Sequence, residues 1–270
     1  MKKFLLGALV LSVFALPLNA AVKINIDDTK SIDIGFVLQN QFIMNGETIN
    51  LGDNAKTFNT RRARLNLGAN IVDYTKLFLQ TEISGQTVTL IDAWARFNIY
   101  ENGYIYTGRH MAPASRTNLT STTALMAIDR PGLTHKTLAW NAGSKYIMNN
   151  TYFTDGRPTD GTSALAAPEA VRDNGVTLFG TYSLNNDLHY KYYVGTYKGV
   201  QASNNDLRIT GRLQVNIGDA EKGYFDKSTY FGNKDTIAIG LSVDNQKNVL
   251  DTADKGLVDY SLYTIDLFTE

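Results

Sequence analysis

The sequence contains no cysteine among its 270 residues. Disulfide scaffolds, thiolate metal sites and cysteine nucleophiles are therefore excluded, and the fold must be stable without covalent cross-links. Only three histidines are present, and no two of them have the spacing at which both would ligate one metal ion. We therefore predict neither a metal site nor a cofactor.

Long apolar runs are also missing beyond the start of the chain, so a helical membrane protein is excluded. At the start, Lys2 and Lys3 precede an apolar run from Phe4 to Leu16, and a small-residue cleavage site follows at 17–20. This order is typical of a secretory signal peptide, which we place at residues 1–20. The alternative, a buried core helix, fits the charged start and the cleavage site poorly.

The chain has no excess of either charge, with 26 Lys and Arg against 26 Asp and Glu. Removing the signal with Lys2 and Lys3 would leave a net charge of about −2, so no attraction to nucleic acid is indicated. The remaining residues, 21–270, number about 250 and would suit one large all-β domain or two smaller ones. Their composition shows no linker that would divide them.

What the chain does have is a strict alternation of polar and apolar residues. It is clearest from Asp206 to Ile217, where every second residue is apolar except Gly211. A helix would bring Leu207, Gly211 and Gln214 onto one face and mix the two classes, whereas a strand separates them. The same period predicts about twelve strands. The others are expected at 31–42, 62–71, 76–84, 90–100, 104–111, 136–142, 146–153, 175–184, 188–199, 234–243 and 257–268.

Strand length and connection length favour a membrane barrel over a soluble sandwich. Several predicted strands run about ten to twelve residues, close to what a tilted membrane strand needs. Short turns such as 185–187 alternate with long connections such as 112–134, as in bacterial outer-membrane barrels. Two connections depart from this rule, since 85–87 is short and 218–233 is long, which leaves the strand count open by one pair. An open sheet in lipid would leave edge groups unpaired, so we predict an all-β fold, a closed antiparallel transmembrane β-barrel, over 21–270.

Four motifs lie on or beside these strands, namely RRARLNLG at 61–68, FLQTE at 78–82, LIDAW at 90–94 and GRHMAP at 108–113. Together they resemble the phosphate-selective porin O and P family, most closely between residues 58 and 131. The resemblance implies a trimeric diffusion porin with a barrel of about sixteen strands. It also implies that the glycine-to-proline motif leads into a loop that narrows the pore.

The chain departs from the family in two respects. No lysine occurs between Lys76 and Lys136, where the family has a lysine cluster near the constriction. Weak anion selectivity is therefore a safer expectation than phosphate specificity. The sequence also stops at Phe268-Thr269-Glu270, whereas outer-membrane barrels generally finish on an aromatic residue. We therefore expect a barrel that is incomplete at its C-terminus, the alternative being an unorthodox assembly signal.

Strand parity places a set of charged side chains on the polar faces, which line the lumen if Leu65 and Leu213 meet lipid. The predicted pore-lining residues are Arg62, Arg64, Arg96, Arg109, Arg208, Arg212, Glu82 and Asp92. Two interpretations stay open. The arginines could form a positively charged wall that favours anions, or they could pair with lumenal carboxylates, which would cancel much of the field.

The long connection 112–134 contains Arg116 and Arg130. An inward fold would place both at the constriction of the pore, and a solvated outer loop is the alternative. Arg61 has the opposite strand parity, so we expect it at the lipid interface, where lipid phosphates can pair with it. The aromatic residues near strand ends, expected in a girdle at the same interface, are Tyr74, Tyr100 and Tyr104.

These features predict an outer-membrane porin, a water-filled channel for passive diffusion of small hydrophilic solutes with a weak preference for anions or phosphate. Its expected partners are outer-membrane lipid and lipopolysaccharide, those small anions as solutes, and, from the resemblance, two further copies in a homotrimer. A surface adhesin or structural barrel with a plugged lumen is an alternative. An outer-membrane hydrolase would need a constellation such as His110 with Ser115, and no serine has a recognisable nucleophile setting, so we do not expect an enzyme.

Overall fold

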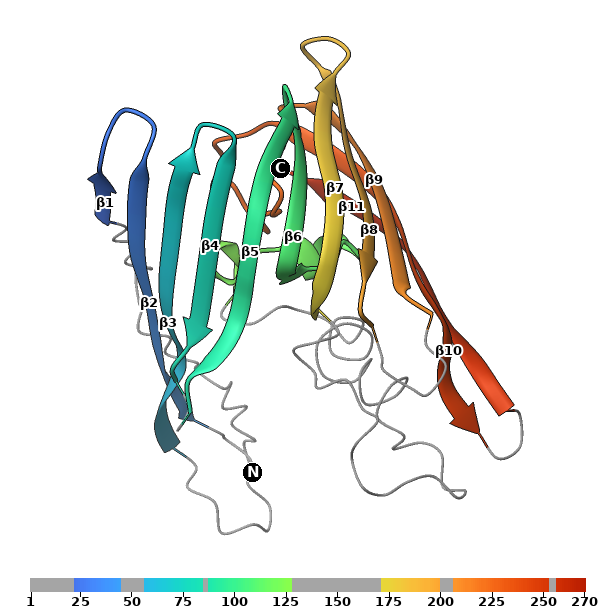
Figure 1. Ribbon diagram of the computed structural model, residues 1–270, viewed down its shortest axis with the longest axis horizontal. Helices are drawn as coiled ribbons and strands as arrows, with labels where there is room; N and C mark the ends of the chain where they lie inside the picture. The colour runs from blue at the N-terminus through green and yellow to red at the C-terminus, as the bar shows by residue number, and fades with distance from the viewer. Residues whose placement is uncertain (1–21, 45–55, 85–86, 128–170, 200–205, 253–255) are drawn as a thin grey trace, which may run out of the picture.

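The structure, a computed structural model, describes residues 22–44, 56–84, 87–127, 171–199, 206–252 and 256–270 (Figure 1). Its strands form one open antiparallel sheet in chain order. The eleven strands are β1 (Val22–Asn25), β2 (Ser31–Met44), β3 (Lys56–Val72), β4 (Thr75–Glu82), β5 (Thr89–Tyr100), β6 (Gly103–Met111), β7 (Arg172–Ser183), β8 (Leu188–Tyr197), β9 (Arg208–Gly218), β10 (Thr236–Thr252) and β11 (Gly256–Thr269). Two short helices, α1 (Arg116–Leu119) and η1 (Thr122–Ala124), follow β6.

The predicted all-β antiparallel fold is confirmed at this level, and the predicted strands correspond to β2 through β11. Two further strands, expected at 136–142 and 146–153, lie outside the described residues. In the sheet β6 and β7 pair directly, from Gly103 with Gly180 to Met111 with Arg172, so no strand lies between them. The short strand β1 was not predicted, because four residues are too few for alternation to reveal.

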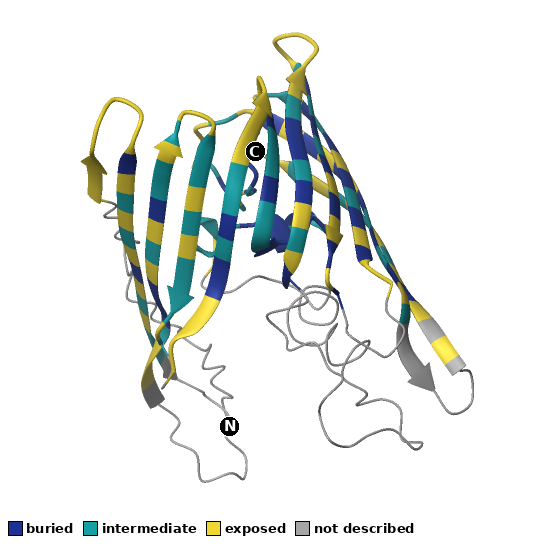
Figure 2. Ribbon diagram, in the orientation of Figure 1, coloured by how far each residue is buried: buried dark blue, intermediate teal, exposed yellow. Residues whose placement is uncertain are grey.

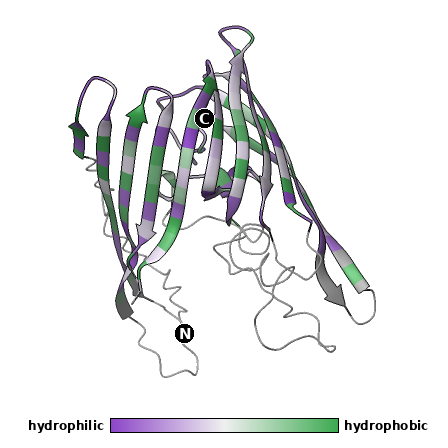
Figure 3. Ribbon diagram, viewed as in Figure 1, coloured by the Kyte–Doolittle hydropathy of each residue, from purple (hydrophilic) through white to green (hydrophobic). Residues whose placement is uncertain are grey.

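The two faces of the sheet differ sharply in chemistry, and the apolar face is the exposed one. Along β9, Arg208, Thr210 and Arg212 are buried, whereas Ile209 and Leu213 are 58% and 48% exposed. Exposed and buried bands alternate along most of the strands in Figure 2, and hydrophobic and hydrophilic bands do so in Figure 3. Soluble proteins bury most of their large apolar side chains, so this distribution is inverted.

The concave face of the sheet is covered by the inward segment, defined here as residues 112–127, which includes α1 and η1. At its start, the Ala114 carbonyl accepts a hydrogen bond of 3.1 Å from the hydroxyl of Thr264 in β11. The backbone N–H of Arg116 donates to Asp266 of the same strand over 3.3 Å. In its described part, the connection that leaves β6 therefore crosses the concave face of the sheet to the last strand.

The second covering segment is the β9–β10 connection, residues 219–235, which sequence reasoning singled out only as too long for its side of the sheet. It enters the same concavity, where the hydroxyl of Tyr193 in β8 donates to the Tyr224 carbonyl over 2.7 Å. The Tyr224 hydroxyl in turn donates to the Met111 carbonyl at the end of β6, also over 2.7 Å. The connection thus contacts β8 and β6, the two strands that flank β7.

Around these contacts lies a cluster of buried apolar and aromatic side chains. Its members are Trp94, Tyr106, Met111, Leu119, Val171, Phe179, Tyr193 and Tyr224. They come from β5 to β8, from the residue before β7 and from the two covering segments, so the interior beside these strands is filled. No helix in the described part of the chain has the length and apolarity needed to cross a membrane.

Candidate functional site

The candidate site is the polar interior where the two covering segments meet. The inward segment is shaped locally by Ser115, whose hydroxyl caps α1 by accepting from the Asn118 backbone N–H over 3.1 Å. The next residues then pair with the β9–β10 connection through its Asp226 backbone. The Asp226 N–H donates to the Leu119 carbonyl over 3.0 Å, and its carbonyl accepts from Ser121 over 3.1 Å.

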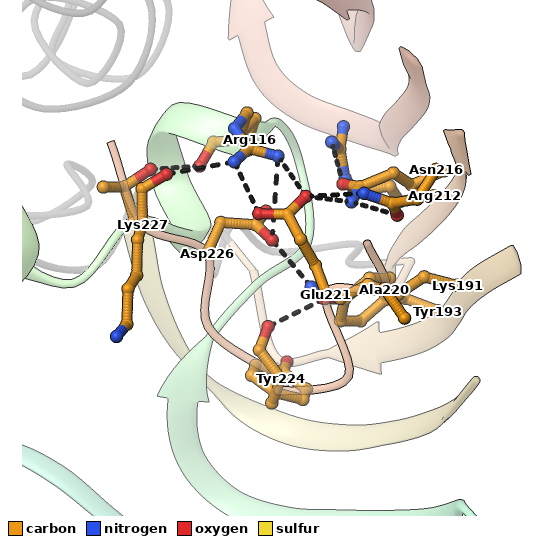
Figure 4. A network of polar contacts seen from close by, with 12 residues as sticks. Arg116, Lys191, Tyr193, Arg212, Asn216, Ala220, Glu221, Tyr224, Asp226 and Lys227 are labelled. Carbon is orange, nitrogen blue, oxygen red and sulfur yellow. Dashed lines mark hydrogen bonds and ion pairs between the residues drawn. The ribbon is translucent and has the colours of Figure 1, made fainter. Parts of the chain in front are cut away.

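Arg116 joins the two segments by a bidentate ion pair. Its guanidinium donates to both carboxylate oxygens of Glu221, over 2.8 Å and 2.7 Å, and a third bond of 3.0 Å reaches the Lys227 carbonyl. The guanidinium also lies 4.0 Å from the centre of the Phe268 ring, close enough for a cation–π contact. Figure 4 shows Arg116 facing Glu221 and Asp226 across the gap between the segments.

The acidic partners are themselves enclosed by donors from the sheet. Asp226 accepts a 2.6 Å bond from the Lys191 ammonium of β8. Glu221 accepts from Gln214 over 2.7 Å and from Asn216 over 3.0 Å, both on the inner face of β9. We call Arg116, Lys191, Glu221 and Asp226 the interior network. Its two cations and two anions balance, so the network as a whole carries no net charge.

The Glu221 carboxyl titrates well below its usual range. Burial alone would raise its pKa, but the hydrogen bond and charge of Arg116 and the charge of Lys191 outweigh burial and lower the pKa to about 2. Because the folded pKa lies below the ordinary value of 4.5, ionised Glu221 contributes stability above pH 4.5 that is lost as the pH falls toward 2.

A Glu221→Gln variant should therefore be less stable than the parent at neutral pH by an amount that shrinks as the solution is acidified. The difference in unfolding free energy is expected to hold steady above about pH 5 and to decline between about pH 4.5 and 2. Urea unfolding of both proteins at several pH values measures it. A difference that stays constant down to pH 2 would show that Glu221 is not the titrating partner of Arg116.

All the predicted pore-lining arginines except Arg109 lie on the inner face, and three of the six are paired with carboxylates. Arg64 of β3 donates to Glu82 of β4 over 2.8 Å, and Arg212 of β9 forms two bonds with Asp266, of 2.6 Å and 2.8 Å. The third pair joins Arg208 of β9 to Asp244 of β10. Of the two interpretations left open, pairing is the one that the geometry favours.

Sequence reasoning missed two ion-pair members, Asp244 and Arg172. Arg208 donates to Asp244 of β10 over 2.7 Å and 2.6 Å, and the predicted Asp92 accepts from Arg172 over 3.0 Å. Asp244 could have been found from the sequence. It directly follows the predicted strand 234–243 and continues its alternation of polar and apolar residues. Arg172 precedes the predicted strand 175–184, so parity could not place it.

The remaining inner arginines have different surroundings. The Arg62 guanidinium donates to the side-chain carbonyl of Gln39 in β2. The Arg96 guanidinium lies 4.9 Å from the centre of the Tyr104 ring, and within the described residues it has no carboxylate at ion-pair distance. Arg130, expected at the constriction, lies outside the described residues.

Two predicted positions are corrected by the register of β6. Arg109 is the cross-strand partner of Ala93 and of the exposed Asn174, which places it on the outer face near the strand end and not in the lumen. Tyr104 stacks on Phe179 at 5.8 Å and packs against the interior cluster, so it is not a residue of the lipid interface. The physical reason is that tyrosine and threonine suit both faces of a strand, so their order left the parity of β6 ambiguous.

The other expected interface residues lie near strand ends. Tyr74 and Tyr100 are 61% and 50% exposed beside the tight turns that follow β3 and β5. Arg61 falls at an irregularity of the β2–β3 pairing, between the partners Arg62 with Gln39 and Thr60 with Asn40. The bulge makes its face independent of simple parity, and its side chain is half-buried.

The two histidines in the described part of the chain, His110 and His189, lie in no constellation of the kind a hydrolase needs. His110 is buried and bonds to the Thr177 hydroxyl over 2.7 Å and to the Gly108 carbonyl over 3.0 Å, not to Ser115. His189 contacts the Ser183 hydroxyl over 2.7 Å, but its other ring nitrogen bonds to a backbone carbonyl rather than to a carboxylate. In the described part of the chain, no group of three or more His, Cys, Asp or Glu could hold a metal ion.

No protein-family model matches the chain, and no curated protein matches it significantly. The resemblance to the phosphate-selective porin O and P family therefore stays a prediction. The assignment of function rests on the geometry of the faces and of the interior.

Proposed function

We propose that the protein is an outer-membrane porin, a closed barrel around a water-filled channel through which small hydrophilic solutes diffuse. The observation that carries the proposal is the inverted sheet, with paired charges on the concave face and exposed Ile, Leu, Val and Phe side chains on the convex face. Such a surface is unstable in water and suits contact with lipid acyl chains and lipopolysaccharide. A sheet in lipid must also close or pair its edges, here β1 and β11.

The charge pairing supports a weak ion preference. Arg64, Arg116, Arg208 and Arg212 each have a carboxylate partner within 2.8 Å, so their fields are largely cancelled at the distances of a passing ion. Arg96, which stacks on an aromatic ring, is the inner arginine best placed to add a small preference for anions such as phosphate. A trimer, as the resemblance implies, is part of the same proposal.

The deciding experiment is conductance in a planar lipid bilayer. The purified protein should give stepwise, ohmic conductance, and a salt gradient at about 0.1 M, where screening acts beyond about 10 Å, should give a small reversal potential of the anion-selective sign. Absence of steps after verified insertion would reject the channel. A strong cation preference would reject the anion selectivity alone.

A charge on the convex face provides a separate test of the membrane assignment. Leu213→Arg, at the middle of β9, should cost about 2–4 kcal/mol of stability in lipid, because the guanidinium would sit at bilayer depth. Tyr182→Arg, near the end of β7, is the matched control and should cost about 0–1 kcal/mol. Urea unfolding from lipid vesicles measures both. Equal, small effects at the two positions would show that the convex face does not meet lipid.

One observation favours a second candidate, a structural or adhesive barrel with a plugged lumen. The aromatic cluster and the interior network fill the concavity beside β5 to β11, and Tyr193, Phe179 and Lys191 are each only 1% exposed. The same bilayer measurement separates the two candidates, since a plugged barrel would insert stably into lipid and conduct nothing.

A further inference from the structure

The concave face beside β2, β3 and β4 differs from the filled part of the interior, because it contains a hollow of about 200 Å³. That volume is below the roughly 300–1,000 Å³ typical of drug-sized ligands, so it suits one small ring. The inner-face residues that line the hollow are Asp33, Gly35, Asn66, Gly68, Lys76 and Phe78. If the protein is a porin as proposed above, a solute in its lumen can reach this hollow.

An aromatic platform forms one side of the hollow. The Phe78 ring is stacked on Trp94 with centroids 5.0 Å apart and planes 27° from parallel. Phe78 is partly buried and stands at the margin of the interior cluster. The cross-strand partner of Phe78 in β3 is Gly68, so β3 contributes no side chain opposite the ring. A Cβ at Gly68 would lie 3.4 Å from the Asp33 side chain.

Polar groups of both kinds surround the platform. The Asp33 carboxylate and Lys76 ammonium lie 3.7 Å apart, each about 30% exposed, so they add an acceptor and a donor without net charge. The Asn66 side-chain carbonyl accepts a 2.6 Å bond from Gln80, which fixes the amide and leaves its NH₂ as a donor. The amide nitrogen lies 3.6 Å from the position that a Cβ on Gly35 would take.

We infer that this hollow binds an uncharged, hydroxyl-rich ring, of which a pyranose sugar is the simplest representative. The C–H face of such a ring can pack on the Phe78 ring, and its hydroxyls both donate and accept, matching Lys76, Asn66 and Asp33. A free anion would have to compete with Asp33 for Lys76, and a free cation would have to compete with Lys76 for Asp33. The inference deepens the proposed porin function by naming the solute class.

Binding can be read out without conductance, because one of the two tryptophans, Trp94, supports the platform. In a Trp140→Phe background, the purified full chain in detergent micelles would be titrated with glucose, with maltotriose and with sodium phosphate. Both sugars should change the fluorescence saturably, and phosphate should not. Phe78→Leu should weaken sugar affinity by about tenfold, a change of about 1.4 kcal/mol.

Two variants guard against misfolding as the cause of that loss. Phe78→Tyr keeps the ring and should keep the affinity, and Phe97→Leu, which removes an exposed ring from the outer face of β5, should have no effect. A missing or unsaturable sugar response overturns the inference, as do an affinity that Phe78→Leu leaves unchanged and saturable binding of phosphate alone. If the same protein conducts ions but binds no sugar, this site is rejected and the porin proposal stands. If it binds sugar but does not conduct, the porin proposal is rejected and the site stands.

Discussion

Replacing Arg116 with alanine is expected to destabilise the folded protein by about 3–5 kcal/mol, because removal of one partner of a buried ion pair leaves the other charge uncompensated. Arg116 is 7% exposed and Glu221 is 4% exposed. Without the guanidinium, Lys191 would be the one cation left in the interior network for Glu221 and Asp226, and its ammonium already bonds to Asp226. The loss falls on the contact between the inward segment and the β9–β10 connection.

Urea unfolding from lipid vesicles measures this loss, and two controls give it meaning. The double variant Arg116→Met with Glu221→Met removes both charges at similar volume and should be much closer to the parent in unfolding free energy. Lys30→Ala removes an ion pair with Asp27 that is nearly half exposed at the β1–β2 turn, and it should change little. If Arg116→Ala proved as mild as Lys30→Ala, the two covering segments would not be joined by this pair.

The faces of the sheet were predictable because alternation is a local property. In β9 the order of Leu207 to Ile217 alone separates an apolar set from a polar set, and the structure exposes the first and buries the second. The same reasoning put Arg62, Arg64, Arg208 and Arg212 on the polar face of their strands, and the structure buries all four. Whether that sheet closes into a barrel in a membrane is a proposal that rests on those faces.

The pairing of these residues was not predictable, because it depends on register and on segments far apart in the sequence. Arg116 and Glu221 are 105 positions apart, and they meet only because two connections from opposite ends of the strands enter one concavity. Nothing in the local sequence of residues 219–235 distinguishes a connection that folds inward from one that extends into solvent. Its unexpected length was the one available signal.

Strand parity could not place every residue, for two different reasons. A bulge between Gln39 and Asn40 interrupts the β2–β3 register, so the face of Arg61 could not be counted from its neighbours. In β6 the pairing from Tyr104 to Arg109 is regular, but the faces are the opposite of those predicted. Tyr104 and Tyr106 face the interior, and Arg109 does not. Position 240 must be glycine for a packing reason that the sequence does not reveal. A Cβ there would lie 2.3 Å from Arg212 and 2.5 Å from Asp266, so Gly240 makes room for the Arg212–Asp266 pair.

Neutralising one member of the Arg64–Glu82 pair should change ion selectivity more than any single substitution in the filled part of the interior. Arg64 donates to Glu82 over 2.8 Å and to the Thr122 hydroxyl of η1 over 2.7 Å, so it lies where the covering segment meets the wall of β3 and β4. Glu82→Gln would keep the shape and free the arginine charge, moving the reversal potential toward anions. Arg64→Gln would free the carboxylate and move it toward cations.

The expected size follows from the Coulomb energy of a single charge beside the path. At about 4 Å two unit charges interact by about 1 kcal/mol in water and about 4 kcal/mol at an effective dielectric of 20, so a free Arg64 should raise the anion-to-cation permeability ratio at least about fivefold.

The double variant Arg64→Gln with Glu82→Gln restores neutrality and should return the ratio to that of the parent. Asp27→Asn, exposed at a turn, is the control and should leave it unchanged. Reversal potentials at about 0.1 M and 1 M salt test the cycle, because the Debye length falls from about 10 Å to about 3 Å and should shrink both single-variant shifts. Shifts of the same sign in the two single variants would show that the pair acts through the shape of the passage and not through its charge.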